Sequence, residues 1–448
     1  MDEELLNLGL AVANDSSGKS KRKRWDDSSS LQLCQDYEGK VIRLLHMREQ
    51  MLRTEPKKEE SVEDDKGLHL IHLLLISAAT EVDKNKFDSA MEDVIELYRI
   101  VSLTGNSVQR VAAYFADGLA AKLLTRKSPF FNMIMKEPTT EEQFLAFTEF
   151  YRISPYYQFA HFTANQAIIE AFEEEEEQNN RSLHVIDFNI SNGFQWPSLI
   201  QSLSEKATSD NQISLHITGY STSLEELIQT ETRLVNFAKG FHNLIFEFQG
   251  LLRDSIPICS PRKDENETVA VNMVFYLHTF TTSLQISDTL KSVYSLNPSI
   301  VILVEQESSQ SPRSFLSRFI DSLNYFAAMF DSLDDCLPRE SSMRLSIEKN
   351  HLGKEIKKMI YCEKDDENYQ RHERLETWKG RMESHGFKGF NLSSKSLIQA
   401  KLLLKIRSHC SHLGGGGGFR VFERDEGKAL SLGWQDRYLI TASAWHCL

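Results

Sequence analysis

The residue types that could carry out chemistry gather in one stretch, residues 183–203. It opens with an apolar run that is typical of a buried parallel strand and ends on a carboxylate: Leu183, His184, Val185, Ile186 and Asp187. A turn follows, and then a helix begins in which apolar residues recur at helical spacing. In an α/β sheet, a nucleotide enzyme keeps its phosphate loop at this place. Asp187 could coordinate a polar group there, or it could cap the turn.

Two sequence requirements decide whether that loop still holds a cofactor. Glycines must let the loop backbone approach the ligand, and an acid at the end of the second strand should bind the ribose hydroxyls. The loop at 188–193 contains one glycine, Gly193, and a bulky Ile190. The second expected strand ends in Thr218 and Gly219 without an acid. Both requirements fail, so we expect no bound cofactor and no enzyme activity.

Other constellations point less clearly to chemistry. The sequence contains no GxSxG, P-loop or HExxH motif. The His/Cys cluster at 409–412 lacks a matched second pair of ligands, so we expect no zinc site. Three arginines in one expected helical segment could contact DNA, namely Arg371, Arg374 and Arg381. Glutamates alternate with them, so a salt-bridged exposed helix is the competing interpretation.

Composition and charge bound the class of protein. The 448 residues have 41% hydrophobic and 26% charged content, as in an ordinary globular protein, and a formal net charge of −13. This acidic balance repels phosphate backbones, so DNA binding would need a local basic patch. The six cysteines form no CxxC pair, as expected of reduced thiols. No signal peptide is evident and the apolar run at 68–79 is too short to span a bilayer, so we expect a soluble intracellular protein without a membrane partner.

The N-terminal third divides into an arm and a helical block. Residues 1–66 are expected to be a flexible arm with a basic cluster at 19–24. Its four consecutive basic residues suit a nuclear-import signal or a nucleic-acid tether, unless they are simply solvated: Lys21, Arg22, Lys23 and Arg24. Helical spacing then predicts a cap over residues 67–172. It contains an LxxLL string that could dock in a partner's groove or pack in the core: Leu70, Leu73 and Leu74.

Residues 173–448 alternate between strands and helices. Strands are expected at 183–188, 213–219, 244–248, 269–275 and 299–305, with helices between them. Such alternation predicts a parallel sheet with right-handed crossovers. The segments 419–423 and 429–445 suit antiparallel strands added at the sheet edge. The predicted fold is therefore an α/β, methyltransferase-like (Rossmann-type), mostly parallel sheet with an N-terminal helical cap and a C-terminal antiparallel hairpin.

An ordered set of motifs resembles the GRAS family of plant transcriptional regulators over roughly residues 66–448. Residues 183–187 look like the family's VHIID core, and the turn after them matches its glycine–glutamine–tryptophan–proline pattern: Gly193, Gln195, Trp196 and Pro197. By resemblance, residues 224–252 form a second leucine-rich region, 265–362 a PFYRE-like region and 363–448 a SAW-like region. The SAW-like region would be anchored by Trp434, Ser443, Ala444 and Trp445. The spacing from Glu376 to Trp378 is shorter than the family's usual pattern.

The resemblance implies a regulator that acts in the nucleus. Implied partners are other GRAS proteins, as homo- or heterodimers, DNA-binding transcription factors, and promoter DNA reached directly or indirectly. The chain looks SCARECROW-like, near branches that act in plant development or in root symbiosis with mycorrhizal fungi. The alternatives are a direct sequence-specific DNA binder and a small-molecule-binding or methyltransferase-like protein.

Overall fold

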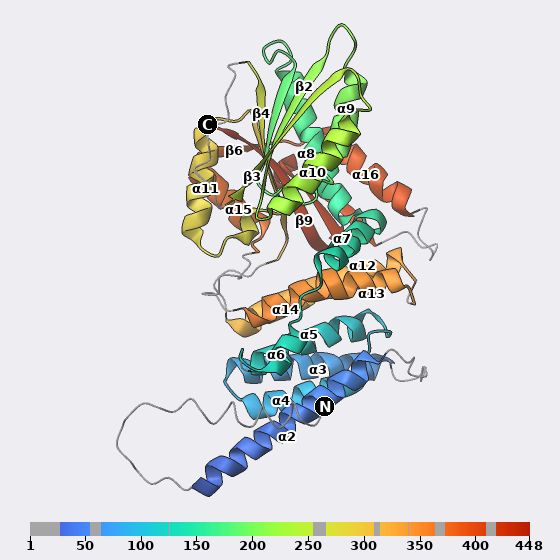
Figure 1. Cartoon of the computed structure of the whole chain (residues 1–448), viewed down its shortest axis with the longest axis vertical. Helices are drawn as coiled ribbons and strands as arrows, with labels where there is room; N and C mark the ends of the chain where they lie inside the picture. The colour runs from blue at the N-terminus through green and yellow to red at the C-terminus, as the bar shows by residue number, and fades with distance from the viewer. Residues whose placement is uncertain are drawn as a thin grey trace, which may run out of the picture.

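The computed structural model describes residues 27–53, 64–124, 126–253, 266–308, 314–338, 340–362, 372–408 and 418–448. The basic residues 21–24, Arg371 and the cluster at 409–412 lie outside the described residues. Figure 1 shows two parts along the long axis, a stack of helices at the N-terminal end and an α/β unit above it. Among the described helices, none combines the length and apolar character needed to cross a membrane.

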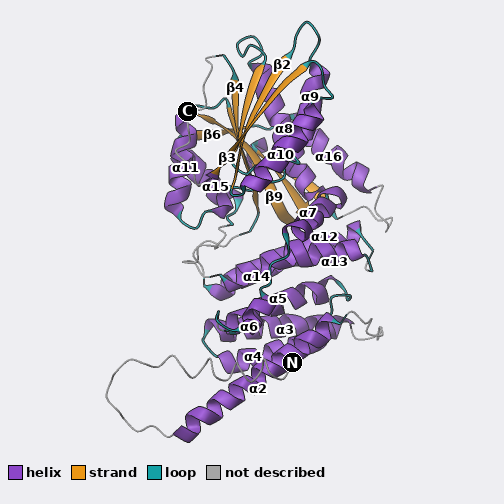
Figure 2. Cartoon of the chain, in the orientation of Figure 1, coloured by secondary structure: helices purple, strands orange, loops and turns teal. Residues whose placement is uncertain are grey.

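A single nine-stranded sheet forms the α/β unit (Figure 2). Its strand order is β3-β2-β1-β4-β5-β9-β8-β7, and β6 pairs with β9 beside this path. Five strands run parallel: β1 (Ser182–Asp187), β2 (Ile213–Ser221), β3 (Leu244–Leu252), β4 (Thr268–Val274) and β5 (Ile300–Gln306). The antiparallel part consists of β6 (Phe387–Phe390), β7 (Phe419–Arg424), β8 (Ala429–Trp434) and β9 (Arg437–Cys447).

The parallel strands form because their apolar runs are covered on both faces. Every residue of β4 and β5 is buried. The larger core cluster lies beneath α8 (Pro155–Glu174), α9 (Trp196–Lys206) and α10 (Leu224–Ala238). A second cluster lies beneath α11 (Ser283–Ser295) and α15 (Leu375–Ser384). Helix α16 (Ser394–Ser408) packs along α8 at the outside of the molecule (Figure 1).

The helical part is built around α5 (Ser107–Leu123), in which all but a few residues are buried. Around it lie α3 (Asp64–Asp83), α4 (Phe87–Ile100), α6 (Pro129–Ile134), α12 (Phe315–Cys336) and α14 (Gly353–Tyr361). Helix α2 (Asp27–Leu52) packs on α4. Its Arg48 binds Asp117 of α5 through both carboxylate oxygens, at 2.7 and 2.8 Å. The flexible arm expected over residues 1–66 therefore contains a helix that packs into the cap.

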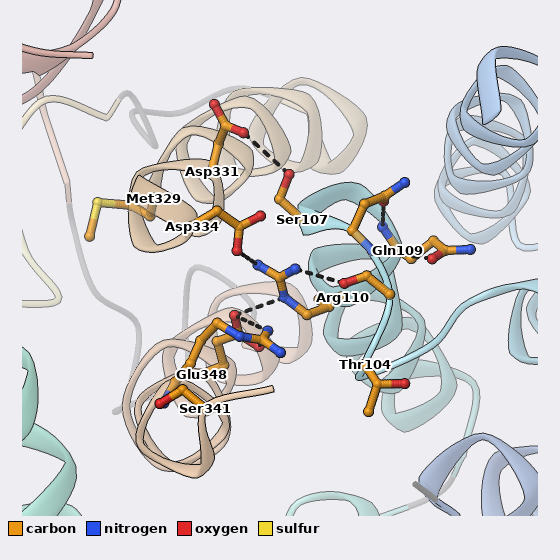
Figure 3. Close-up of polar contacts among 12 residues, drawn as sticks. Thr104, Ser107, Gln109, Arg110, Met329, Asp331, Asp334, Ser341 and Glu348 are labelled. Carbon is orange, nitrogen blue, oxygen red and sulfur yellow. Dashed lines mark hydrogen bonds and ion pairs between the residues drawn. The ribbon is translucent and has the colours of Figure 1, made fainter. Parts of the chain in front are cut away.

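A buried ion cluster joins the cap to the helices inserted late in the chain (Figure 3). The Arg110 guanidinium donates to Glu348 at 2.9 Å and to the Gly105 carbonyl at 2.8 Å, and it also contacts Asp334. Arg344 of α13 (Ser342–Ile347) donates to both oxygens of Glu348, at 2.9 and 3.1 Å. Glu348 opens the single π-helical turn η3 (Glu348–Leu352) and is fully buried, as is Arg110. Since these partners lie 238 residues apart, the cluster fixes how α5 sits on the later helices.

The fold class expected from the sequence is confirmed, but several elements differ from expectation. The short strand β6 was not predicted, and the C-terminal addition has three long strands instead of a two-part hairpin. The remaining helices are α7 (Thr140–Ile153) and the 3-10 turns η2 (Leu277–Thr279) and η4 (Asp425–Gly427).

Candidate functional site

The VHIID-like strand β1 ends on a buried carboxylate held by three neutral donors. Asp187 accepts hydrogen bonds from the backbone NH of Asn189 at 3.0 Å and from the indole Nε1 of Trp196 at 3.0 Å. The third donor is the side-chain amide of Asn272 on β4, at 3.2 Å. Asp187 therefore ties strand β1 to β4 and to the start of α9, which is the turn-holding role among the two roles that the sequence left open.

A second polar group continues from this carboxylate. The amide of Gln195 donates to Asn165 of α8 and to Asn272, each at 3.0 Å. Asn165 returns a hydrogen bond to the Gln195 carbonyl at 2.9 Å. All three amides are buried, and such groups are stable inside a protein only when they are paired in this way. The glycine–glutamine–tryptophan–proline pattern thus fixes the β1–α9 turn.

The side chain of Ile190 packs against strand β2. A side chain added at Gly219, two residues before the end of β2, would meet the Ile190 side chain at 2.8 Å. An acid at this position could therefore be accommodated only if the neighbouring turn moved. Beside it, the rings of Phe188 and Tyr220 stack at 5.5 Å and close the same region.

A cavity of about 200 Å³ remains in front of the carboxyl ends of β1 and β4. It is lined by four aromatic rings, two histidines, Asp187 and the β1–α9 turn; the rings and histidines are Phe147, Tyr157, Phe194, Phe275, His161 and His351. Two of its residues that are not glycine adopt left-handed backbone conformations, Ser191 at φ 45° and Phe275 at φ 52°. Such conformations are uncommon for these residue types and gather at ligand sites.

The electrostatics of the cavity follow from burial. Burial raises the pKa of Asp187 to about 6, although its hydrogen bonds and the Arg253 charge oppose the shift. Burial lowers the pKa of His161 to about 3 and lowers that of His351. At neutral pH, Asp187 is therefore mostly ionised and both histidines are neutral.

The residues present do not fit the adenosyl cofactor of a methyltransferase. The cavity is smaller than the roughly 300 Å³ at which sites for drug-sized ligands begin. The loop after β1 carries the bulky Ile190 where a cofactor would need a close approach of the backbone. Position 219 is a glycine, which cannot supply an acid for the ribose hydroxyls. In the described part of the chain, no three His, Cys, Asp or Glu side chains are grouped so that they could hold a metal ion.

Comparison with known proteins decides the family. The GRAS domain family model matches residues 71–446. The chain belongs to the GRAS domain family. Its resemblance to this family, drawn from the motif order, is thereby confirmed, and with it the class of plant transcriptional regulators.

Individual GRAS relatives match most of the chain. Scarecrow-like protein 21 of Arabidopsis thaliana is 33% identical over 383 residues, which is 84% of this chain and 88% of the relative. DELLA protein 2 of Medicago truncatula is 35% identical over 395 residues, 85% of this chain and 68% of the relative. The crystal structure of SCL7 in Oryza sativa has a TM-score of 0.68 at 29% identity, covering 84% of this chain and 99% of that chain.

The LxxLL string of this GRAS chain lies on α3 with its leucines divided between solvent and core. Leu70 and Leu73 are 45% and 50% exposed, and Leu74 packs against the core. The docking interpretation would thus have two leucines available. Docking through these leucines stays a prediction.

The arginines considered for DNA contact are paired with carboxylates where the structure describes them. Arg381 forms a two-point ion pair with the buried Glu373, at 2.6 and 2.7 Å. Arg374 lies 3.7 Å from Asp321. Pairing of this kind matches the salt-bridged interpretation and leaves less charge for phosphate.

The SAW-like residues lie in β8 and β9, where they are buried. Trp434 donates from its indole to Asp331 of α12 at 2.8 Å, and Trp445 donates to Ser443 at 2.9 Å. Ala444 pairs with Ile302 across the β5–β9 ladder. These contacts suit the proposed role of C-terminal anchors.

Sequence reasoning missed the aromatic lining of the cavity. Phe147 lies on α7, Tyr157 on α8, Phe275 after β4 and His351 in η3, so no local pattern groups them. A faint signal was available in the run of aromatic residues at 144–157. Helical periodicity assigns such residues to a core, which they also form.

Proposed function

We propose that this GRAS protein regulates transcription in the nucleus by docking protein partners, and that it is not an enzyme. Two features support the second part: Ile190 packs so closely against Gly219 that no acid fits there, and the remaining cavity is too small for the cofactor. The partners we propose are other GRAS proteins and DNA-binding transcription factors, through which the chain reaches promoter DNA. The basic residues 21–24 are the proposed import signal.

The observation that carries the docking function is the outer face of α16. Three aliphatic side chains spaced four residues apart are exposed there: Ile398 at 63%, Leu402 at 52% and Ile406 at 56%. The opposite face of α16 packs on α8 through Ala400 and Leu403. A stripe with this spacing matches the contact face of a helix that pairs with another segment.

The charges beside the stripe indicate the partner's chemistry. Lys395, Lys401 and Lys405 are exposed within the same helix, whose sequence contains no acidic residue. A second copy of this face would repel it, whereas an acidic segment with its own leucines would match both the charge and the stripe. We therefore propose an acidic, leucine-rich segment of a partner regulator as the occupant.

A tethered reporter assay tests this function. The full chain is fused to an unrelated DNA-binding domain and directed to a reporter gene in plant protoplasts. Replacing the stripe, Ile398→Ser with Leu402→Ser and Ile406→Ser, should abolish the change in reporter output without lowering protein level. The matched control, Leu224→Ser with Ile228→Ser, removes two residues of α10 that are similarly exposed and should leave the output unchanged. Equal activity of both variants would refute docking through α16.

Direct DNA binding is the competing function. Phosphate contacts lose affinity steeply as salt rises, so a salt-titrated binding assay on promoter fragments separates the two. We expect weak binding without sequence preference for the purified chain. Tight sequence-specific binding that Arg374→Ala weakens would favour the competing function.

The biological setting we propose is plant development or root symbiosis with mycorrhizal fungi. Its support is the SCARECROW-like resemblance of the motif set. Root colonisation in plants that lack the gene tests the symbiotic role, which would be rejected if colonisation were normal.

A further inference from the structure

We propose that the cavity in front of β1 and β4 binds a small organic cation of the alkylammonium type. The inference concerns a ligand of the GRAS core itself and does not depend on docking at α16. It rests on four properties of the cavity: the arrangement of its rings, the sign of its charge, its size and its backbone.

Aromatic rings line the cavity and pack against one another. Phe147 lies 4.8 Å from Tyr157 and 5.3 Å from Phe194, and the ring planes meet at 58° and 77°. Tyr157 in turn lies 5.3 Å from Phe275, with the planes at 78°. Rings set at such angles present both faces and edges around a common space. The face of an aromatic ring carries negative charge density and attracts cations, most strongly where water is excluded.

The only ionised side chain among the described residues that line the cavity is Asp187. Its three hydrogen-bond donors are neutral groups, so the negative charge has no cation in direct contact. The nearest guanidinium, Arg253, instead donates to the Phe188 carbonyl and to Asn189. Both lining histidines are neutral at pH 7, since burial lowers the pKa of each. An anion would meet the Asp187 carboxylate, whereas a cation would find the carboxylate and the rings.

The volume limits the ligand to a small group. About 200 Å³ is somewhat more than the roughly 150 Å³ of an engineered cavity that holds benzene. A trimethylammonium group with a short chain fits this space, and a complete nucleoside does not.

The backbone adopts an uncommon conformation at two residues that line the cavity. Phe275 keeps its left-handed φ because its NH donates to Val304 at 2.9 Å and its carbonyl accepts from Asn189 at 3.0 Å. Ser191, on the facing turn, is also left-handed, and its carbonyl accepts from Thr230. Two uncommon conformations on opposite walls, each fixed by hydrogen bonds, are typical of a preorganised ligand site.

Two probes of the same shape and different charge provide the test. Choline and its neutral carbon analogue, 3,3-dimethyl-1-butanol, are titrated into the full chain by NMR. We expect saturable choline binding with upfield-shifted methyl signals, because ring currents act on a group enclosed by aromatic faces. The neutral analogue should bind about tenfold more weakly or worse, since the attraction between the cation and the rings is lost.

Variants on one helix provide the control. Phe147→Leu removes a ring that lines the cavity and should weaken choline binding several-fold. Phe144→Leu removes a ring of the same helix that does not line the cavity and should leave it unchanged. Thermal melting of both variants shows whether each is folded, and a second lining variant, Phe194→Leu, replaces Phe147→Leu if that variant fails to fold.

Competition with a peptide distinguishes two natural sources of the alkylammonium group, a modified protein and a free metabolite. If a trimethyl-lysine peptide competes with choline, the source is a modified protein; if only choline binds, the source is a free metabolite. The proposal is overturned if neither cation binds saturably, if the neutral analogue binds as tightly, or if benzoate binds in preference.

Discussion

Single residues determine what the methyltransferase-like sheet can still bind. Ile190 lies against Gly219 so closely that neither position can gain atoms without moving the other. Asp187 is held by three donors, and its carboxylate serves the turn instead of a ribose. The sequence predicted the loss of the cofactor from Ile190 and from the missing acid. It did not predict that Ile190 meets Gly219, because the first lies in the β1–α9 turn and the second lies in β2.

The Ile190–Gly219 contact gives a first prediction. Gly219→Ala should destabilise the chain by about 1–3 kcal/mol, the usual range for overpacking a filled core. Ile190→Ala opens a space, so the double variant should be more stable than the sum of the single effects predicts. Urea unfolding of the four chains measures this coupling, and strictly additive effects would show that the two residues do not meet.

Asp187 gives a second prediction, concerning pH. Its pKa in the folded state, about 6, lies above the ordinary 3.8, so the carboxyl group stays protonated up to a higher pH in the folded state than in the unfolded chain. The resulting contribution to the free energy of unfolding is fully present when the pH is below the ordinary pKa of 3.8. It is lost as the pH rises through about 6, and the total loss is about 3 kcal/mol. Asp187→Asn removes this titration but leaves one of the three donors unpaired. The variant should therefore be clearly less stable than the parent at acidic pH, and the gap should narrow towards neutral pH.

Comparing the parent with the Asp187→Asn variant separates the titration of Asp187 from that of its neighbours. His161 and His351 face the same cavity, Arg253 lies beside it and Glu355 lies near His351, but all four are common to both chains. Urea midpoints measured across the pH range provide the test. A gap that stays constant with pH would mean that Asp187 is ionised as easily as it is in water.

At the scale of elements, α5, α12 and η3 meet around a buried charge cluster. Arg110, Arg344 and Glu348 are each no more than 2% exposed. The sequence could not name the partners of Arg110, because Glu348 lies 238 residues away. Periodicity finds elements, and only tertiary packing shows which faces meet.

Breaking this cluster gives a third prediction. Glu348→Gln should destabilise the chain by about 3–5 kcal/mol, since it removes the buried carboxylate that Arg110 and Arg344 share and leaves Asp334 as the carboxylate that Arg110 contacts. The control is Glu96→Gln, which breaks an exposed pair with Arg99 and should cost about 0.5 kcal/mol or less. Similar losses in the two variants, measured by urea unfolding, would contradict the structural role of the cluster.

At the scale of the whole molecule, the C-terminal strands complete the sheet that the earlier chain begins. Strand β9 pairs with β5, β6 and β8, so it lies between the parallel and the antiparallel parts. The five parallel strands were predictable because their apolar runs are distinctive, as in Ile300–Gln306. Strand β6 was not, because its four residues include Gly389 and gain their conformation from pairing with β9. A short helix over residues 31–52 was expected from the sequence, but its packing on α4 was not.

Removing the tail gives a fourth prediction. A chain that ends at Gly414 lacks β7, β8 and β9, which exposes the buried edge of β5. It should be insoluble or should melt without cooperativity. A soluble truncation with a sharp melting transition would show that the parallel core folds alone.

The GRAS core of this chain keeps the sheet of a nucleotide enzyme, but side chains of the chain itself fill the space in which a cofactor would bind. Calorimetric titration of the full chain with S-adenosylmethionine tests this most directly, because Ile190 and the small cavity should leave no room for the nucleoside. We predict no saturable heat of binding. Saturable binding in the micromolar range would contradict it.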